Sequence, residues 1–349
     1  MPLRALPRPT ASARRCVLQV PGLLALAAAL VMLMTVPPAR GEVSAGAGLG
    51  AAQVRVSAGD YSGAAEMLKE ILLSTPGDAA AHYLSGRCYY ELHDYDHAVE
   101  EAVRSVELAP ENSLYHQWLG RAYGGKADRE KSFFLARKVK KELEKAVALD
   151  PSNVGARRDL QRFYTDAPWI VGGSREKALA MVDAIASIDP VEGRLARADY
   201  DLHALGDSAA ADKEYRAVLA TGVRRAGPYF EAADFFAGRK DASSLEQALK
   251  AAVKASPSDP RLSYYRGVAG VVAGGGPDDA ERELRAYLAA PERSDWPSHA
   301  DAREWLGRLF EGTGRLSDAA AEYRKALVTE PSRRETLTRL RNIEKSLKR

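Results

Sequence analysis

A short run with two histidines has the residue types and spacing of a metal site. His93 and His97 lie four residues apart and enclose Asp94, Tyr95 and Asp96. Imidazole nitrogens and carboxylate oxygens are metal ligands, so this run could hold a cation. The remaining histidines (His82, His116, His203 and His299) show no ligand spacing.

Ser174 and Lys177 are the other candidates for chemistry, because their S-x-x-K spacing occurs in acyl-serine enzymes. The companion motifs of those enzymes are absent, and a serine after Gly172-Gly173 suits the N-cap of a helix. Neither glycine-rich run, at 172–173 or at 274–276, has the Gly-Lys-Ser/Thr of a phosphate-binding loop. We therefore predict a protein with no catalytic residue, no metal ion and no cofactor.

Regularly spaced prolines indicate the elements that carry these residues. Six prolines recur in a common rhythm, and the first two lie 34 residues apart, as do Gly86 and Gly120. Self-similarity at that period is typical of a solenoid of helix–turn–helix repeats. These prolines stand at Pro76, Pro110, Pro151, Pro190, Pro257 and Pro331.

The clearest repeat spans residues 79–112 and places Gly86, Tyr89, Ala98 and Pro110 at its positions 8, 11, 20 and 32. With these residues the segment resembles the tetratricopeptide repeat. That family also favours Asp-Tyr-Asp in its turn, which gives the run around Tyr95 a structural interpretation beside the metal one. The resemblance implies an all-α fold and a protein that binds protein partners.

The register can be followed from about residue 45 to the end of the sequence. We predict an α-solenoid of about eight tetratricopeptide helix–turn–helix repeats, closed by a capping helix at 334–349. The repeats fall near residues 45–78, 79–112, 113–153, 154–191, 192–225, 226–259, 260–293 and 300–333.

The resemblance also implies which side chains face the concave groove, because fixed positions of the first helix point there. Arginine and tyrosine interleave at these positions, and guanidinium groups pair well with carboxylates. The pattern favours an acidic peptide or a chain-terminal carboxylate; the alternative is that the arginines only solvate a helix face. Tyr83 and Arg87 stand where the carboxylate-clamp subtype has Lys and Asn, so binding of chaperone tails is not implied. The predicted groove residues are Tyr83, Arg87, Tyr90, Gln117, Arg121, Arg158, Arg162, Tyr200 and His203.

Two neighbouring insertions break the period, since consecutive prolines lie 41 residues apart from Pro110 and 39 apart from Pro151. The first insertion lies beside Phe133 and Phe134, and the second contains Trp169-Ile170-Val171. We expect these apolar side chains to bury one another and brace the groove. An exposed second binding patch and a disordered loop are the alternatives. The segment at 163–178 also resembles one found in secreted bacterial tetratricopeptide proteins.

The first 41 residues have the composition of a secretory signal. Arginines precede an apolar stretch at 22–36, and Ala39 and Gly41 suit cleavage before Glu42. An uncleaved membrane anchor is the alternative. We predict a periplasmic or secreted protein after cleavage, or one anchored in the inner membrane without it.

Removing this leader changes the charge from +3 to −2, because it contains five of the 50 basic residues and none of the 47 acidic ones. Nucleic-acid binding thereby loses its support. Cys88 is then the one cysteine left, a core thiol or, less simply, a reactive one. We predict a non-catalytic scaffold that binds a protein or an acidic peptide. A membrane-tethered structural component and an enzyme with an unrecognised site are the alternatives.

Overall fold

The fold is all-helical in the part of the chain that the structure describes. The structure is a computed structural model that describes residues 40–293 and 296–348. Within these ranges it contains seventeen α-helices, one 3₁₀ turn and no strand. None of these helices is long and apolar enough to cross a bilayer. The predicted leader lies outside the described residues, apart from its last two.

Sixteen of the helices form eight antiparallel pairs, and α17 follows them, as predicted for a tetratricopeptide solenoid with a capping helix. The first helices of the pairs are α1 (Arg40–Ser57), α3 (Ala79–Glu91), α5 (Ser113–Glu130), α7 (Val154–Asp166), α9 (Pro190–His203), α11 (Gly227–Gly238), α13 (Arg261–Ala273) and α15 (His299–Gly312). The second helices are α2 (Tyr61–Ser74), α4 (Tyr95–Leu108), α6 (Phe133–Leu149), α8 (Arg175–Ile188), α10 (Ser208–Leu219), α12 (Ala242–Ala255), α14 (Pro277–Leu288) and α16 (Leu316–Thr329). The capping helix α17 spans Arg334–Leu347, and the 3₁₀ turn η1 spans Trp169–Val171.

Acidic and amide side chains start many of these helices. The Asp94 carboxylate accepts a hydrogen bond from the backbone N–H of His97 at 3.3 Å, and its other oxygen lies 2.7 Å from Nδ1 of the His97 ring. The run around Tyr95 is thus a helix cap. No group of three or more His, Cys, Asp or Glu side chains in the described residues is placed to hold a metal ion. Ser174 accepts from the N–H of Lys177, which confirms its predicted capping role.

Glycines allow the two helices of a pair to approach closely, as predicted for Gly86, Gly120 and Gly307. A Cβ at Gly120 would lie 2.9 Å from Leu143, and one at Gly86 would lie 3.1 Å from the backbone nitrogen of Ala102. A Cβ at Gly307 would overlap the ring of the fully buried Tyr323. These positions cannot accept a larger side chain without moving a helix.

The core runs along the solenoid because each pair packs on its neighbours. Buried residues form three successive clusters, at 52–88, 98–204 and 195–343. Cys88 is fully buried in the first cluster, and this burial raises the pKa of its thiol to about 12. The thiol is therefore a core group without the thiolate character that reactivity requires.

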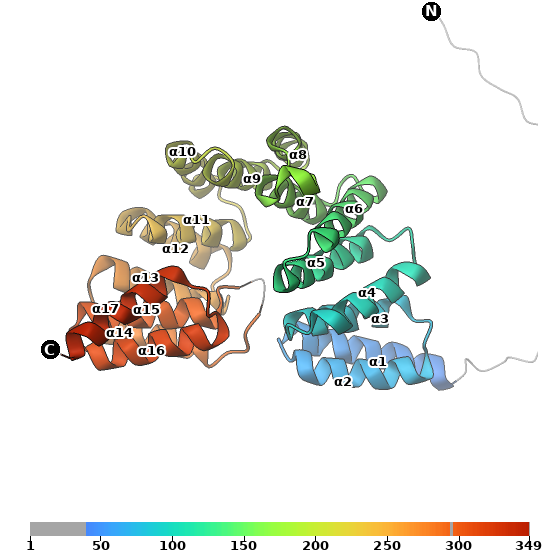
Figure 1. Ribbon diagram of the computed structural model, residues 1–349, viewed down its shortest axis with the longest axis horizontal. Coiled ribbons are helices and arrows are strands. Elements are labelled where there is room, and N and C mark those ends of the chain that lie inside the picture. Colours follow the sequence, from blue (N-terminus) through green and yellow to red (C-terminus); the bar gives the residue numbers. More distant parts are fainter. Residues whose placement is uncertain (1–39, 294–295, 349) are drawn as a thin grey trace, which may run out of the picture.

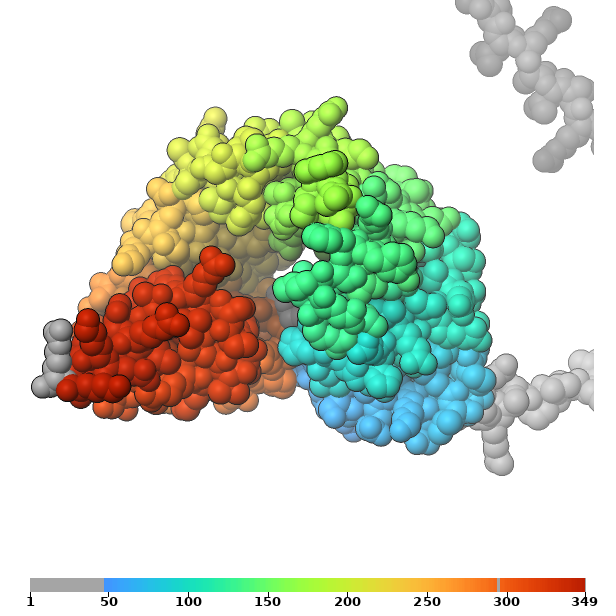
Figure 2. All heavy atoms as spheres, in the orientation of Figure 1, coloured from blue at the N-terminus to red at the C-terminus, as the bar shows by residue number. Residues whose placement is uncertain are grey.

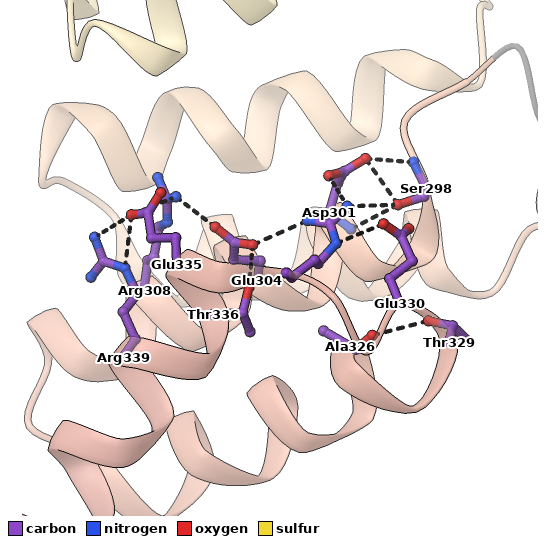
Figure 3. A network of polar contacts seen from close by, with 11 residues as sticks. Ser298, Asp301, Glu304, Arg308, Ala326, Thr329, Glu330, Glu335, Thr336 and Arg339 are labelled. Carbon is purple, nitrogen blue, oxygen red and sulfur yellow. Dashed lines mark hydrogen bonds and ion pairs between the residues drawn. The ribbon is translucent and has the colours of Figure 1, made fainter. Parts of the chain in front are cut away.

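The capping helix is tied to α15 by a network of polar contacts around Glu304 (Figure 3). Glu304, only 8% exposed, accepts from the Thr336 hydroxyl at 2.6 Å and from Arg308 at 2.6 Å. Arg333 donates to the same carboxylate at 3.1 Å. One buried side chain therefore connects α15, the start of α17 and the turn before it.

The pairs follow one another round an arch whose two feet meet (Figure 1). The Arg293 guanidinium, in the connection between α14 and α15, donates to the backbone oxygen of Ser57 at 2.8 Å. Gly59, in the first turn of the solenoid, lies against Pro291. The space-filling view shows the N-terminal and C-terminal feet side by side (Figure 2). The solenoid thus closes around its own inner face.

Candidate functional site

A central cavity of about 740 Å³ lies on the inner face of the arch. Its walls come almost wholly from first helices of the pairs, which is the side that this repeat presents to its concave surface. Its lining residues fall on α3, α5, α7, α11, α13, α15 and the residues just before α15. Three predicted groove residues, Tyr90, Arg121 and Arg162, line it.

A second hollow, the side cavity, has about 640 Å³ and opens between α5, α6, α7 and η1. Val139, Leu143 and Phe163 are among its apolar walls, and it shares Tyr90, Arg121, Asp159 and Arg162 with the central cavity. The two insertions make it: α5 and α6 are longer, at 18 and 17 residues, than the helices of most other pairs, and η1 lies in the second insertion. The insertions therefore add an apolar chamber to the groove.

Arg121 is held by a carboxylate of the next repeat. Its Nε donates to Asp159 at 2.7 Å and its Nη2 donates to the other oxygen of Asp159 at 3.2 Å. Its guanidinium also lies over the Trp118 ring, 4.8 Å from the centroid, and Arg87 lies 5.1 Å from the same ring. Burial would lower the pKa of Arg121, but the Asp159 carboxylate raises it above its ordinary value. Arg121 is a permanent, oriented cation at the mouth of both cavities.

Arg158 has a structural position. It is buried, and its two Nη atoms donate to Glu192 at 3.0 Å and to Glu231 at 2.8 Å. These contacts join α7 to α9 and α11, so the side chain stabilises the stacking of three repeats. It lines neither cavity.

Arg162 is the cation that the central cavity leaves free. It is exposed and forms no hydrogen bond or ion pair with any residue that the structure describes. Arg261, the third cation of that cavity, is paired with Asp259 at 2.8 Å. A ligand carboxylate could therefore pair with Arg162 without displacing a partner.

The remaining predicted groove residues differ in position. Tyr83 stacks on Tyr115 with ring centroids 5.1 Å apart, and Gln117 donates to Asp159 at 2.8 Å, so both support the groove from behind. Tyr200 is buried and His203 is exposed, and neither lines a cavity.

The expectation that Trp169 is buried in a bracing contact is wrong. Trp169 is 85% exposed, whereas Val171 is 2% exposed and lines the side cavity. The 3₁₀ turn points Val171 inward and leaves its two preceding side chains outside. Phe133 and Phe134 are exposed as well.

An acidic and aromatic wall opposite the arginines was missed by the sequence analysis. It comprises Phe230, Glu231, Asp234, Tyr264, Tyr265, Trp296 and Asp301. The mapping of groove positions ended at the fifth repeat, although the same register places Phe230 and Asp234 at positions 5 and 9 of the sixth. Extending the register was the signal that could have found this wall.

Asp234 is the unusual group of this wall. Protein surrounds its position, yet its side chain is exposed to the cavity and accepts from the Tyr265 hydroxyl at 2.9 Å. Burial raises the pKa of Asp234 to about 7, despite the opposing hydrogen bond from Tyr265. The nearby Asp301 and Glu231 carboxylates act in the same direction as burial. The central cavity thus has a cationic side on α5 and α7 and an anionic side on α11 to α15.

Comparison with known proteins agrees with this architecture. Residues 55–122 and residues 270–333 each match a family described as "Tetratricopeptide repeat". The chain is 24% identical over 279 residues to "Tetratricopeptide repeat protein 37" of Xenopus laevis; the match covers 76% of this chain and spans 16% of the length of that relative.

Solved structures with similar folds share little sequence with this chain. The Cut9–Hcn1 complex of the APC/C matches 81% of this chain and 52% of that one, with 13% identity and a TM-score of 0.49. A tetratricopeptide repeat protein from Parabacteroides merdae matches 86% of this chain and 99% of that one, with 13% identity and a TM-score of 0.46. The matched repeats at both ends and the helix pairs between them identify this chain as an α-solenoid of the tetratricopeptide-repeat type.

Proposed function

We propose that this protein is a non-catalytic scaffold that holds an extended peptide segment of a partner protein in its inner face. Tetratricopeptide-repeat proteins generally act as protein-interaction scaffolds. The observation that carries the proposal is the union of two cavities, one apolar and one polar, at Tyr90 and Arg162. A peptide has the same two components, apolar side chains and a polar backbone.

The two cavities define the chemistry of the segment. The side cavity takes one large apolar side chain, which Val139, Leu143 and Phe163 surround. A carboxylate next to that side chain reaches Arg162, either as an acidic residue or as the end of the chain. Basic groups of the same segment face Asp234 and Glu231 on the other wall. The ligand is thus of mixed charge, with its acidic part near α7.

Replacing Arg162 by Ala should weaken binding of this segment by roughly 1.5–3 kcal/mol, the usual value of a hydrogen bond to a charged group. A photocrosslinking residue introduced at Tyr90 in cells would capture the partner, and mass spectrometry would identify the captured segment. Fluorescence anisotropy with that peptide would then compare the parent protein with Arg162→Ala at several salt concentrations.

Arg266→Ala is the matched control, because Arg266 is an exposed arginine outside both cavities and without a printed ion pair in the described chain. We expect it to bind like the parent. Equal affinity of Arg162→Ala and parent would mean that the acidic part of the ligand lies elsewhere.

We also propose that the protein is exported, on the basis of the leader composition. Sequencing the N-terminus of protein isolated from its native compartment should then give a start near Glu42. An intact Met1 in a membrane fraction would instead support the tethered alternative.

A further inference from the structure

Four large apolar side chains are exposed together at the two insertions. Phe133 is 63% exposed, Phe134 68%, Trp169 85% and Ile170 53%. We call these four residues the apolar tip. Phe134, Trp169 and Ile170 line neither cavity, so the peptide site does not account for them.

The two segments that form the apolar tip are in contact with each other. Arg137, one turn along α6 from Phe133, donates to the backbone oxygen of Ile170 at 3.4 Å. Gly172 faces the side chain of Lys140, which a Cβ would approach to 2.8 Å. Phe133 and Val171 line the same side cavity. The apolar tip is therefore one surface feature composed of two turns.

Cations without acidic partners surround the apolar tip. Residues 131–141 contain five basic side chains and no acid, and residues 167–177 add two basic side chains and one acid, Glu176. No ion pair to any of the seven is printed for the described chain, and Lys138 lies over the Phe134 ring, 5.1 Å from its centroid. We call them the flanking cations: Lys131, Arg137, Lys138, Lys140, Lys141, Arg175 and Lys177.

This segregation contrasts with the rest of the molecule. From residue 42 onward the chain has a net charge of −2, from 45 basic and 47 acidic residues, and many of its arginines are paired. Exposed rings that project from turns and are ringed by free cations match the interface of an anionic bilayer. Aromatic side chains favour the depth of the lipid headgroups, and nearby lysines and arginines are attracted to anionic lipids.

We propose that the apolar tip and the flanking cations dock this protein on the surface of a membrane containing anionic lipid. A bilayer accepts projecting side chains without a complementary groove, which suits a tip made of two turns. The side cavity begins at Phe133, so docking places the peptide site next to the membrane surface. This proposal is independent of the peptide ligand and of the leader.

The test is co-sedimentation of the full chain with vesicles of phosphatidylglycerol and phosphatidylcholine, compared with vesicles of phosphatidylcholine alone. We expect binding to the anionic vesicles that weakens as salt rises. The variant Phe134→Ser/Trp169→Ser/Ile170→Ser should bind at least tenfold more weakly. The variant Lys141→Gln/Arg175→Gln should bind about fivefold more weakly for each charge removed.

Matched controls use equally exposed residues elsewhere. Leu73→Ser/Val328→Ser removes two exposed apolar side chains, and Lys69→Gln/Lys254→Gln removes two exposed lysines, and both should bind like the parent. The leader contains no tryptophan, so the fluorescence difference between parent and Trp169→Phe reports on Trp169 alone. We expect that difference spectrum to shift to shorter wavelength on anionic vesicles.

Three results would overturn the proposal. The first is equal vesicle binding by the parent and the triple serine variant, and the second is equal binding to neutral and anionic vesicles. The third is a Trp169 emission that vesicles do not change. Loss of a captured protein partner in the triple variant, without any vesicle binding by the parent, would assign the surface to a protein instead.

Discussion

Glu304→Ala should destabilise the C-terminal end of the solenoid by about 3 kcal/mol. Removing one partner of a buried charge pair costs roughly 3–5 kcal/mol, because the remaining groups stay buried without compensation. Here the remaining groups are the fully buried Thr336 and the guanidiniums of Arg308 and Arg333. Both arginines keep other carboxylates, which places the expected cost at the lower end. Urea unfolding would measure the loss, and hydrogen exchange should locate it in α15 to α17.

The control is Glu335→Ala in the same network. Glu335 pairs with Arg308 and Arg339, but its side chain is 60% exposed. Exposed pairs contribute about 0–1 kcal/mol, so this variant should unfold almost like the parent. A loss as large as that of Glu304→Ala would show that charge number, and not burial, holds the capping helix.

The Glu304 contact also gives the stability of this end a dependence on pH. Burial by itself would raise the pKa of Glu304, but the Thr336 hydroxyl and the Arg308 and Arg333 guanidiniums lower it below its ordinary value of 4.5. A carboxyl whose pKa is lower in the folded state stabilises the fold above its unfolded pKa. That stabilisation is lost as the pH falls through the folded pKa. Glu304→Ala should therefore reduce the difference in stability between neutral and strongly acidic pH.

Gly307→Leu should destabilise the same end by about 3 kcal/mol, through overpacking of the helix pair α15/α16. The added side chain meets the ring of Tyr323, which is fully buried and donates its hydroxyl hydrogen to Glu311 at 2.6 Å. The ring cannot move aside without breaking that bond and shifting α16. Thermal unfolding followed by circular dichroism would measure the effect.

Gly312→Leu tests the same substitution on the same helix in an open position. Nothing lies within 4 Å of a Cβ at Gly312, so Leu there should be neutral or stabilising by up to about 1 kcal/mol through helix propensity. Equal melting temperatures of the two variants would contradict the close contact at Gly307.

The fold could be predicted from the sequence because it depends on local signals that repeat. Helix caps such as Asp94, close-contact glycines such as Gly120 and the spacing of prolines each determine a feature within one repeat. Repetition then multiplies the evidence, since every pair packs in the same way on the next. The helix pairs and the capping helix could therefore be predicted without any long-range information.

The site could be predicted only in part, because a register position gives a direction and not a partner. Tyr90, Arg121 and Arg162 reach the cavity as the register implies, while Arg158, from the same pattern, turns to Glu192 and Glu231. Glu231 lies 73 residues along the chain, and nothing local to Arg158 signals it. The exposure of Trp169 was likewise undetermined, since an insertion has no repeat position to follow.

The contact between Ser57 and Arg293 has a consequence for the order in which a ligand can be threaded. Because the two feet of the arch touch, the inner face is encircled by the chain (Figure 2). A free tail can slide along the axis of this ring with the contact intact. A segment lying between two folded domains cannot, and it enters only after Arg293 has released Ser57. The same scaffold therefore sorts partners by topology, accepting chain ends quickly and internal segments at the rate at which the ring opens.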